Sequence, residues 1–358
     1  MASLTQASII ARKVIRYGIY ALILIIVARF ALRGGIGLYR RIFPTPPPEP
    51  TLAFGLLTAL PFPEEPRPEN LNLSLELAEG QLPELPIQEA VYFMPEFKPN
   101  IQVLDEAKRK AQSMGFNPEG RIIVENVPNV YIFDRGQTPS SMTMNIVTGV
   151  FSISYNVNED PSVLNGVPPS GEQAISQARS FLQAAKILED DLKTSPATNE
   201  FLRLEEGRFV RAISQSEANV AKANIFRANY GSGENIPAVT PDMPEANVWF
   251  IFAPRANQVI AAEYHYFPVD ASSLGTYPLK TAQTAWDELQ SGGGFIANLG
   301  DNPEANVVIR HVYLAYYDAG QYSPYYQPVV VFEGDNNFFA YVPAVTNEYY
   351  GRAETGTQ

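Results

Sequence analysis

The chain has 358 residues, 46% of them hydrophobic, which is enough for two or three compact units that each bury a core. It contains no cysteine, so disulfides, thiolate metal sites and a cysteine nucleophile are excluded. Residues 1–50 hold seven of the 26 basic residues and one of the 38 acidic residues, so the rest of the chain carries 19 basic and 37 acidic residues. Because such an acidic region repels phosphate backbones, nucleic acid is not expected as a partner.

An apolar segment near the N-terminus predicts a membrane helix. Tyr17–Ala28 is uninterrupted by polar residues and lies between Arg16 and Arg29. Its twelve residues would rise about 18 Å as a helix, short of the roughly 30 Å hydrocarbon core of a bilayer. We therefore extend the expected span over residues 9–43, with the arginines reaching the membrane surface. A cleaved signal peptide and a buried helix of a globular domain are the alternatives.

This segment also predicts a location and a partner. Residues 1–42 are expected to form a transmembrane anchor, and the lipid bilayer is the expected partner of residues 9–43. Basic residues flank the segment on both sides, so their distribution does not choose the orientation. The Pro-rich, Lys-poor and Tyr-rich composition of the remainder favours a single-pass protein of the cell membrane whose C-terminal domain lies outside the cytoplasm.

A proline-rich segment follows the expected helix. Residues 44–50 read Pro-Thr-Pro-Pro-Pro-Glu-Pro, and consecutive prolines favour an extended polyproline II conformation. We expect residues 43–84 to form a stalk that continues as irregular chain. A PxxP ligand for a recognition domain is the alternative.

The rest of the chain predicts an α+β fold of repeated units, each with one helix packed on a small antiparallel sheet. The expected units are residues 85–160, 161–270 and 271–346, followed by a C-terminal tail at 347–358. Three separate lobes and one continuous sheet are both compatible with this pattern.

Local motifs place the elements of these units. Apolar residues at helical spacing predict a helix over 101–114, and Thr148-Gly149 predicts a tight hairpin turn. A capping box, Ser170-Gly-Glu-Gln173, predicts the start of a helix that reaches Leu188, and a third helix is expected over 281–289. Strands are expected at 121–125, 130–133, 142–147, 150–155, 209–214, 223–230, 247–253, 258–267, 306–317, 328–332 and 338–342.

The order of helix, strand and short-turned hairpin resembles the PepSY domain and the related YycH/YycI-type extracytoplasmic regulators. The likeness rests on Met142-Thr-Met-Asn-Ile-Val-Thr-Gly-Val-Phe-Ser-Ile153, and the strand Tyr326–Phe332 is similar to their closing hairpin. It covers residues 100–345 in outline, and the order of anchor, spacer and exported domain resembles uncharacterised single-pass bacterial proteins. Those families are mostly non-enzymatic binding or regulatory modules, so the resemblance implies interaction rather than catalysis and carries over no functional residue.

Sequence signatures of catalysis are absent: there is no HExxH, P-loop, GxSxG or dinucleotide-binding fingerprint. Glu263 and His265 would lie on one face of a strand, where they suit a metal site or an acid/base pair, but no third ligand is near in sequence. A solvent-facing or paired strand residue is the simpler interpretation for both His265 and His311. The acidic stretches 189–191 and 301–304 suit calcium without having EF-hand spacing. We therefore predict no catalytic residue, no metal site and no cofactor.

Tyrosine is dense near the C-terminus. Nine of the nineteen tyrosines lie between residues 313 and 350. Exposed tyrosines make adaptable contacts with proteins or glycans, whereas aromatic residues in strands are also common in buried sheet faces. The candidate binding surface consists of Tyr316, Tyr317, Tyr322, Tyr325 and Tyr326.

Together these features predict a membrane-tethered extracytoplasmic interaction, scaffold or regulatory protein without catalytic activity, whose partner is another envelope protein. A cell-envelope enzyme such as a carboxylate-dependent glycan hydrolase is the alternative, since pairs of acids need only meet in space. A module that binds a peptide or a glycan is a third possibility. The sequence does not predict the oligomeric state.

Overall fold

The computed structural model describes residues 16–18, 20–22, 24–33, 48–64, 67–68, 70–122, 128–255, 258–302 and 305–352. Contacts within the chain divide it into two compact units, Met1–Glu49 and Pro50–Gln358.

The expected transmembrane helix is not supported. In the first unit, residues 16–18, 20–22 and 24–33 are helical. No helix in the described part of the chain is long and apolar enough to cross a bilayer, so the fold class predicted with an N-terminal transmembrane helix was wrong in this respect. The physical reason is that the apolar run is short and that its extension passes through Arg29 and Arg33. The remaining residues of the expected span 9–43 lie outside the described residues.

The second unit has an α+β fold with strands in four sheets. Its described helices are α2 (Val103–Ser113), α3 (Gly171–Ala184), α4 (Asp190–Lys193) and α5 (Ala282–Gln290), with short 3₁₀ turns at Pro161–Leu164, Gln215–Glu217, Ser232–Glu234 and Asp335–Asn337. A nine-stranded sheet has the order β4 (Arg121–Ile122), β5 (Val130–Asp134), β6 (Ser140–Asn145), β7 (Phe151–Tyr155), β13 (Val259–Tyr264), β12 (Val248–Phe252), β10 (Val220–Ile225), β8 (Ala197–Glu205), β9 (Arg208–Arg211).

The other sheets are smaller. A six-stranded sheet has the order β11 (Ala238–Val239), β16 (Asn306–Tyr317), β18 (Pro328–Gly334), β19 (Phe338–Pro343), β15 (Phe295–Asn298), and β2 (Asn72–Leu75) also pairs with β16. A three-stranded sheet consists of β14 (Asp270–Pro278), β3 (Gln88–Phe93) and β17 (Tyr325–Tyr326). The strands β1 (Leu57–Thr58) and β20 (Tyr350–Arg352) form a parallel pair.

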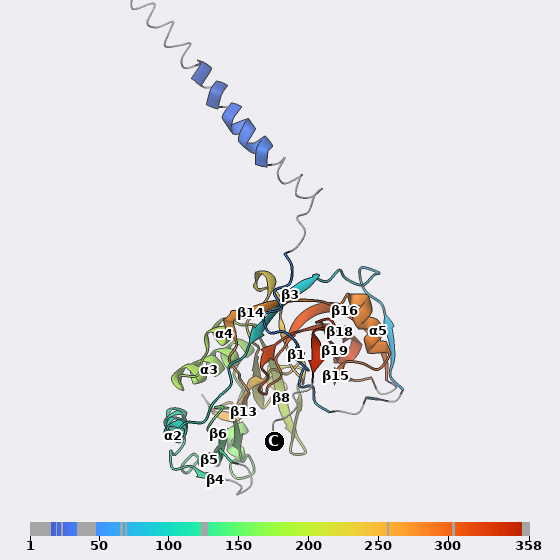
Figure 1. Ribbon diagram of the computed structural model, residues 1–358. Helices are drawn as coiled ribbons and strands as arrows, with labels where there is room; N and C mark the ends of the chain where they lie inside the picture. Colours follow the sequence, from blue (N-terminus) through green and yellow to red (C-terminus); the bar gives the residue numbers. More distant parts are fainter. Residues whose placement is uncertain are drawn as a thin grey trace, which may run out of the picture. The chain divides into compact units, whose positions relative to one another are not determined.

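The first two expected rounds share one sheet. Strands β4 to β7 come from the first round, and β13 of the second round pairs with β7, so the nine strands are continuous. Helices α2 and α3 both pack on this sheet, where Ala111 and Leu182 are fully buried in a core with Phe250. The third round forms the six-stranded sheet, and Trp286 of α5 packs against Phe332 of β18. Figure 1 shows α5 beside β16, β18 and β19.

Several local predictions are confirmed. The capping box is present, with the Ser170 hydroxyl accepting from the Gln173 backbone N–H and the Gln173 side chain accepting from the Ser170 N–H. The hairpin of β6 and β7 turns at Thr148-Gly149, where Gly149 has a φ of 75° that favours glycine. The proline-rich region also contributes regular structure that was not expected, because β1 and β2 lie within residues 43–84.

Candidate functional site

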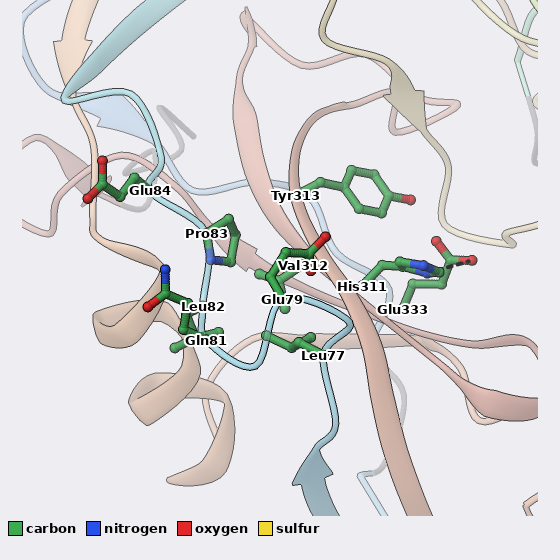
Figure 2. Close-up of a pocket in the computed structure, with 10 residues that line it drawn as sticks. All are labelled: Leu77, Glu79, Gln81, Leu82, Pro83, Glu84, His311, Val312, Tyr313 and Glu333. Atoms are coloured by element: carbon green, nitrogen blue, oxygen red, sulfur yellow. Dashed lines mark ion pairs between the residues drawn. The ribbon is translucent and has the colours of Figure 1, made fainter.

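A hollow of about 430 Å³ lies beside β16 and is the candidate site (Figure 2). One wall is the loop that follows β2, and the other is the middle of β16 with the end of β18. Apolar and titratable side chains line it together: Leu77, Glu79, Gln81, Leu82, Pro83, Glu84, His311, Val312, Tyr313 and Glu333. Such a mixture of apolar walls and a few polar groups is typical of a ligand site.

A bulge in β16 positions the strand side of this hollow. The pairing of β16 with β18 shifts register between Ile309 and His311, so one extra residue is inserted at Arg310. The Arg310 guanidinium donates to both Asp335 oxygens at 2.7–3.0 Å and to a Glu76 oxygen at 2.7 Å, which holds the bulge in place.

His311, Tyr313 and Glu333 then share one face of the sheet. The two residues of β16 alternate with the buried Val312, and Figure 2 shows their side chains projecting from the same side of the strand. Glu333 lies opposite His311 in the neighbouring strand, and the His311 Nδ1 atom is 4.0 Å from a Glu333 carboxylate oxygen. The sheet therefore presents an imidazole, a phenol and a carboxylate side by side.

The electrostatic character of the site is acidic. Glu79 and Glu84 are exposed on the loop, and Glu333 adds a third carboxylate, against which His311 supplies the one basic group of the lining. Burial, together with the adjacent carboxylate and a hydrogen bond to it, raises the pKa of Tyr313. Its hydroxyl is therefore protonated at physiological pH and able to donate.

Hydrogen bonds at its start and apolar packing hold the loop wall in place. The Glu76 N–H donates to the Ile309 carbonyl at 3.0 Å, and the Gly80 N–H donates to the Leu77 carbonyl at 3.0 Å to close a turn. Leu77 and Leu82 pack against the core beneath α5. The loop therefore holds its carboxylates over the hollow from a fixed base.

The predicted tyrosine surface is mostly interior. Tyr316, Tyr317 and Tyr326 are 0%, 2% and 1% exposed, whereas Tyr322 is 37% exposed and Tyr325 is half-buried against Phe93. The Tyr316 and Tyr326 rings stack with centroids 4.9 Å apart. Of the five residues, Tyr322 and Tyr325 alone leave ring surface accessible, and none of the five lines the hollow.

One of these buried tyrosines, Tyr326, lies beside a buried charge. Arg227 donates to Asp191 at 2.9 Å, to Asp318 at 3.3 Å and to the Phe267 carbonyl at 2.7 Å, and its guanidinium lies 5.4 Å from the Tyr326 ring centroid. Asp191, which belongs to the acidic stretch 189–191, therefore accepts a hydrogen bond from Arg227.

No group of three or more potential metal-binding side chains exists among the residues that the structure describes. Residues 303 and 304 of the other acidic stretch lie outside that part.

The Glu263 and His265 pair meets as the alternation of the strand predicts. The His265 Nε2 atom lies 2.9 Å from a Glu263 oxygen, and its Nδ1 atom lies 3.1 Å from the Gly320 carbonyl. The hydrogen bond to Glu263 raises the pKa of His265, although burial opposes the shift. Both ring nitrogens have protein partners, so this pair serves as a link between β13 and the loop after β16.

Sequence reasoning did not find the hollow. In the sequence His311 stands alone, because the bulge at Arg310 and the pairing with Glu333 are not visible in a linear pattern. The loop at residues 77–84 falls within the segment 43–84 that the sequence predicts to be a stalk and irregular chain. The available signal is the alternation of His311 and Tyr313 with the apolar Val312 and Leu314.

Comparisons with known proteins give distant likenesses only. No protein-family model matches the sequence, and no curated protein matches it significantly. An uncharacterized protein from Eubacterium rectale is similar in structure, with 11% identity, 81% of this chain and 92% of that chain covered, and a TM-score of 0.41. The Bacillus megaterium YpeB C-terminal domain is similar with 11% identity, 70% and 95% coverage, and a TM-score of 0.34. Neither likeness bears on family or activity.

Proposed function

We propose that this chain is a binding module for a polypeptide segment that carries a lysine or an arginine. The observation that carries the proposal is the hollow beside β16, whose lining combines apolar residues with three carboxylates. A basic side chain has an apolar stem and a charged end, so it matches both features of the lining.

The exposure of the two loop carboxylates favours binding over catalysis. General acid catalysis by a carboxylic acid at neutral pH depends on apolar surroundings that raise its pKa. Glu79 and Glu84 are exposed on the loop instead. Glu333 is the carboxylate with close partners, namely Tyr313 and His311. Exposed carboxylates on a fixed loop suit the recognition of a cation.

A glycan hydrolase is the second candidate function, because the same hollow combines carboxylates with a tyrosine. It predicts the release of reducing sugar from polysaccharides of the cell envelope and a loss of that activity in Glu333→Gln. The binding proposal predicts no release by either protein.

Selection from a random dodecapeptide library displayed on phage tests the binding proposal. The full chain is immobilised, bound phage are sequenced, and the enriched peptides are synthesised for calorimetry. We expect enrichment of lysine and arginine. We also expect a roughly tenfold weaker binding by a variant with Glu79→Gln and Glu333→Gln, since charge-assisted hydrogen bonds each contribute about 1.5–3 kcal/mol before solvent screening.

Glu348→Gln is the matched control, because Glu348 is also exposed and does not line the hollow. Its affinity for the peptide should equal that of the unchanged chain. The proposal is wrong if no peptide is enriched, or if the double variant binds the peptide as tightly as the control does. The location outside the cytoplasm and the contact of residues 9–43 with lipid stay predictions.

A further inference from the structure

The edge of β16 that faces the hollow has a gap in its pairing. On this edge β2 pairs with residues 306–309, and β11 pairs with residues 316 and 317. Residues 310–315 lie between these two short strands, and among the described residues their pairing is with β18 on the opposite edge. A strand edge of this kind exposes N–H and C=O groups to any chain that approaches it.

Hydrogen bonds at the β11 end of the gap show which backbone groups of β16 face it. The Tyr316 N–H donates to the Pro237 carbonyl beside β11, whereas the Tyr317 N–H donates to Gln327 beside β18. Because successive residues of a strand point their backbone groups to opposite edges, Val312 and Leu314 point theirs to the same edge as Tyr316.

The bulge makes this arrangement possible. Before the bulge, the backbone groups of Ile309 point toward β2, since the Ile309 carbonyl accepts from the Glu76 N–H. The extra residue at Arg310 shifts the alternation of backbone direction by one residue. From there onward, the even-numbered residues point their backbone N–H and C=O groups to the edge that carries the gap. Val312 and Leu314 are 9% and 8% exposed as whole residues, so their side chains are buried and recognition along this edge falls to backbone groups.

The gap has the length of a short strand. Six residues of a strand span about 20 Å, and a neighbouring strand lies about 4.8 Å away. The hollow meets this edge at His311, Val312 and Tyr313, which belong to its lining, and the loop at residues 77–84 forms its far wall (Figure 2). A paired segment would therefore lie between β16 and the loop.

We infer that the partner polypeptide binds by adding a strand to β16 along residues 310–315, with its basic side chain on the face that carries His311, Tyr313 and Glu333. This inference rests on the proposed function and specifies its mode of recognition. Main-chain hydrogen bonds to Val312 and Leu314 supply affinity, as in other cases of strand addition, and the carboxylates select the basic residue.

N-methylation of the selected peptide tests the inference, because it removes one N–H donor at a time. In a paired strand, alternate residues donate to the partner. We expect methylation at alternate positions to weaken binding roughly tenfold or more, while methylation at the intervening positions has a smaller effect. Uniform tolerance to methylation overturns strand addition.

Amide hydrogen exchange of the full chain gives a second readout. The Val312 and Leu314 amides should exchange more slowly when the peptide is bound. The Tyr313 amide is the internal control, because it already lies in a pair with Val331 of β18 and should change little.

The outcomes separate the two proposals. A peptide that depends on Glu333, tolerates every methylation and leaves the exchange of Val312 and Leu314 unchanged would retain the binding function but overturn strand addition. A chain that selects no peptide overturns both.

Discussion

Arg227 is a charged side chain buried where parts of three sheets meet. It follows β10 of the nine-stranded sheet, its partner Asp318 follows β16 of the six-stranded sheet, and Tyr326 belongs to β17. The attraction of the two carboxylates holds the pKa of Arg227 above its ordinary value even though burial opposes this. The charge of Arg227 therefore offsets part of the negative charge of Asp191 and Asp318 inside the protein.

Replacing this residue should strongly destabilise the fold. Arg227→Met would leave two carboxylates without their counterion, and breaking a buried pair in this way costs about 3–5 kcal/mol. Urea denaturation measures the change in the free energy of unfolding. Arg208→Met is the control, because Arg208 is exposed on β9 and should change the stability by about 0.5 kcal/mol or less. Equal effects of the two substitutions would contradict the role of Arg227.

His265 gives the protein a stability component that depends on pH. Its pKa in the folded chain is raised, chiefly by Glu263, above the ordinary value of 6.5. The stabilisation is fully present below the unfolded pKa and is lost as the pH rises through the higher folded pKa. We expect Glu263→Gln to lower the pKa of His265 in an NMR titration, with the His311→Gln variant used to assign the two imidazole signals.

The same pair makes a prediction for stability. The difference in unfolding free energy between the unchanged chain and Glu263→Gln should be larger at pH 6 than at pH 8.5, because the proton is bound at the lower pH. Identical titration curves for His265 in the two proteins would show that Glu263 does not set its pKa.

At the scale of single elements, α3 shows how local signals define a helix. Ser170 and Gln173 exchange hydrogen bonds at its start, and Ala174, Ala178 and Leu182 form the buried stripe toward the sheet. The start of the helix is satisfied locally, whereas its orientation depends on packing with β8, β10 and β12.

Removing the cap should weaken this helix. Ser170→Ala deletes the acceptor for the Gln173 N–H and should destabilise the chain by about 0.5–2 kcal/mol. Thermal or urea unfolding measures this loss. Ser180→Ala, on the exposed face of the same helix, should be neutral or slightly stabilising because alanine has the higher helix propensity. A cap variant as stable as the Ser180 variant would contradict the assignment.

At the scale of the whole second unit, contacts between the sheets argue for cooperative unfolding. The strand β11 comes from the second round of elements but pairs with β16 of the third. The Asn247 side chain donates to the Asp318 carbonyl at 2.6 Å, and His265 reaches the Gly320 carbonyl. Residues 50–358 are also one compact unit by their contacts.

The two tryptophans report on this cooperativity from different sheets. Trp249 lies in β12 of the nine-stranded sheet, and Trp286 lies in α5 against the six-stranded sheet. In Trp249→Phe the fluorescence reports on Trp286, and in Trp286→Phe it reports on Trp249. For each variant we expect the fluorescence and far-UV circular dichroism transitions in urea to coincide. A fluorescence midpoint that differs from the dichroism midpoint would show that the sheets unfold separately.

The sequence by itself determined the elements whose signals are local. The capping box at Ser170, the turn at Thr148-Gly149 and the apolar spacing of 101–114 lie within a few residues of the structures they define, and each is present. The same reasoning failed for the membrane helix, because hydrophobicity between arginines does not establish a span of sufficient length.

Only the tertiary structure decided where the strands pair and which side chains meet. The backbone groups of Val312 point to an unpaired strand edge because of the bulge at Arg310. The Arg310 side chain is held by hydrogen bonds to Glu76 and Asp335, which are far from it in sequence. The burial of Tyr316 likewise depends on distant strands, since residues in a strand acquire a buried or an exposed face only when sheets pack together. Long-range pairing therefore created the candidate site, and the local alternation of His311 and Tyr313 is only one part of it.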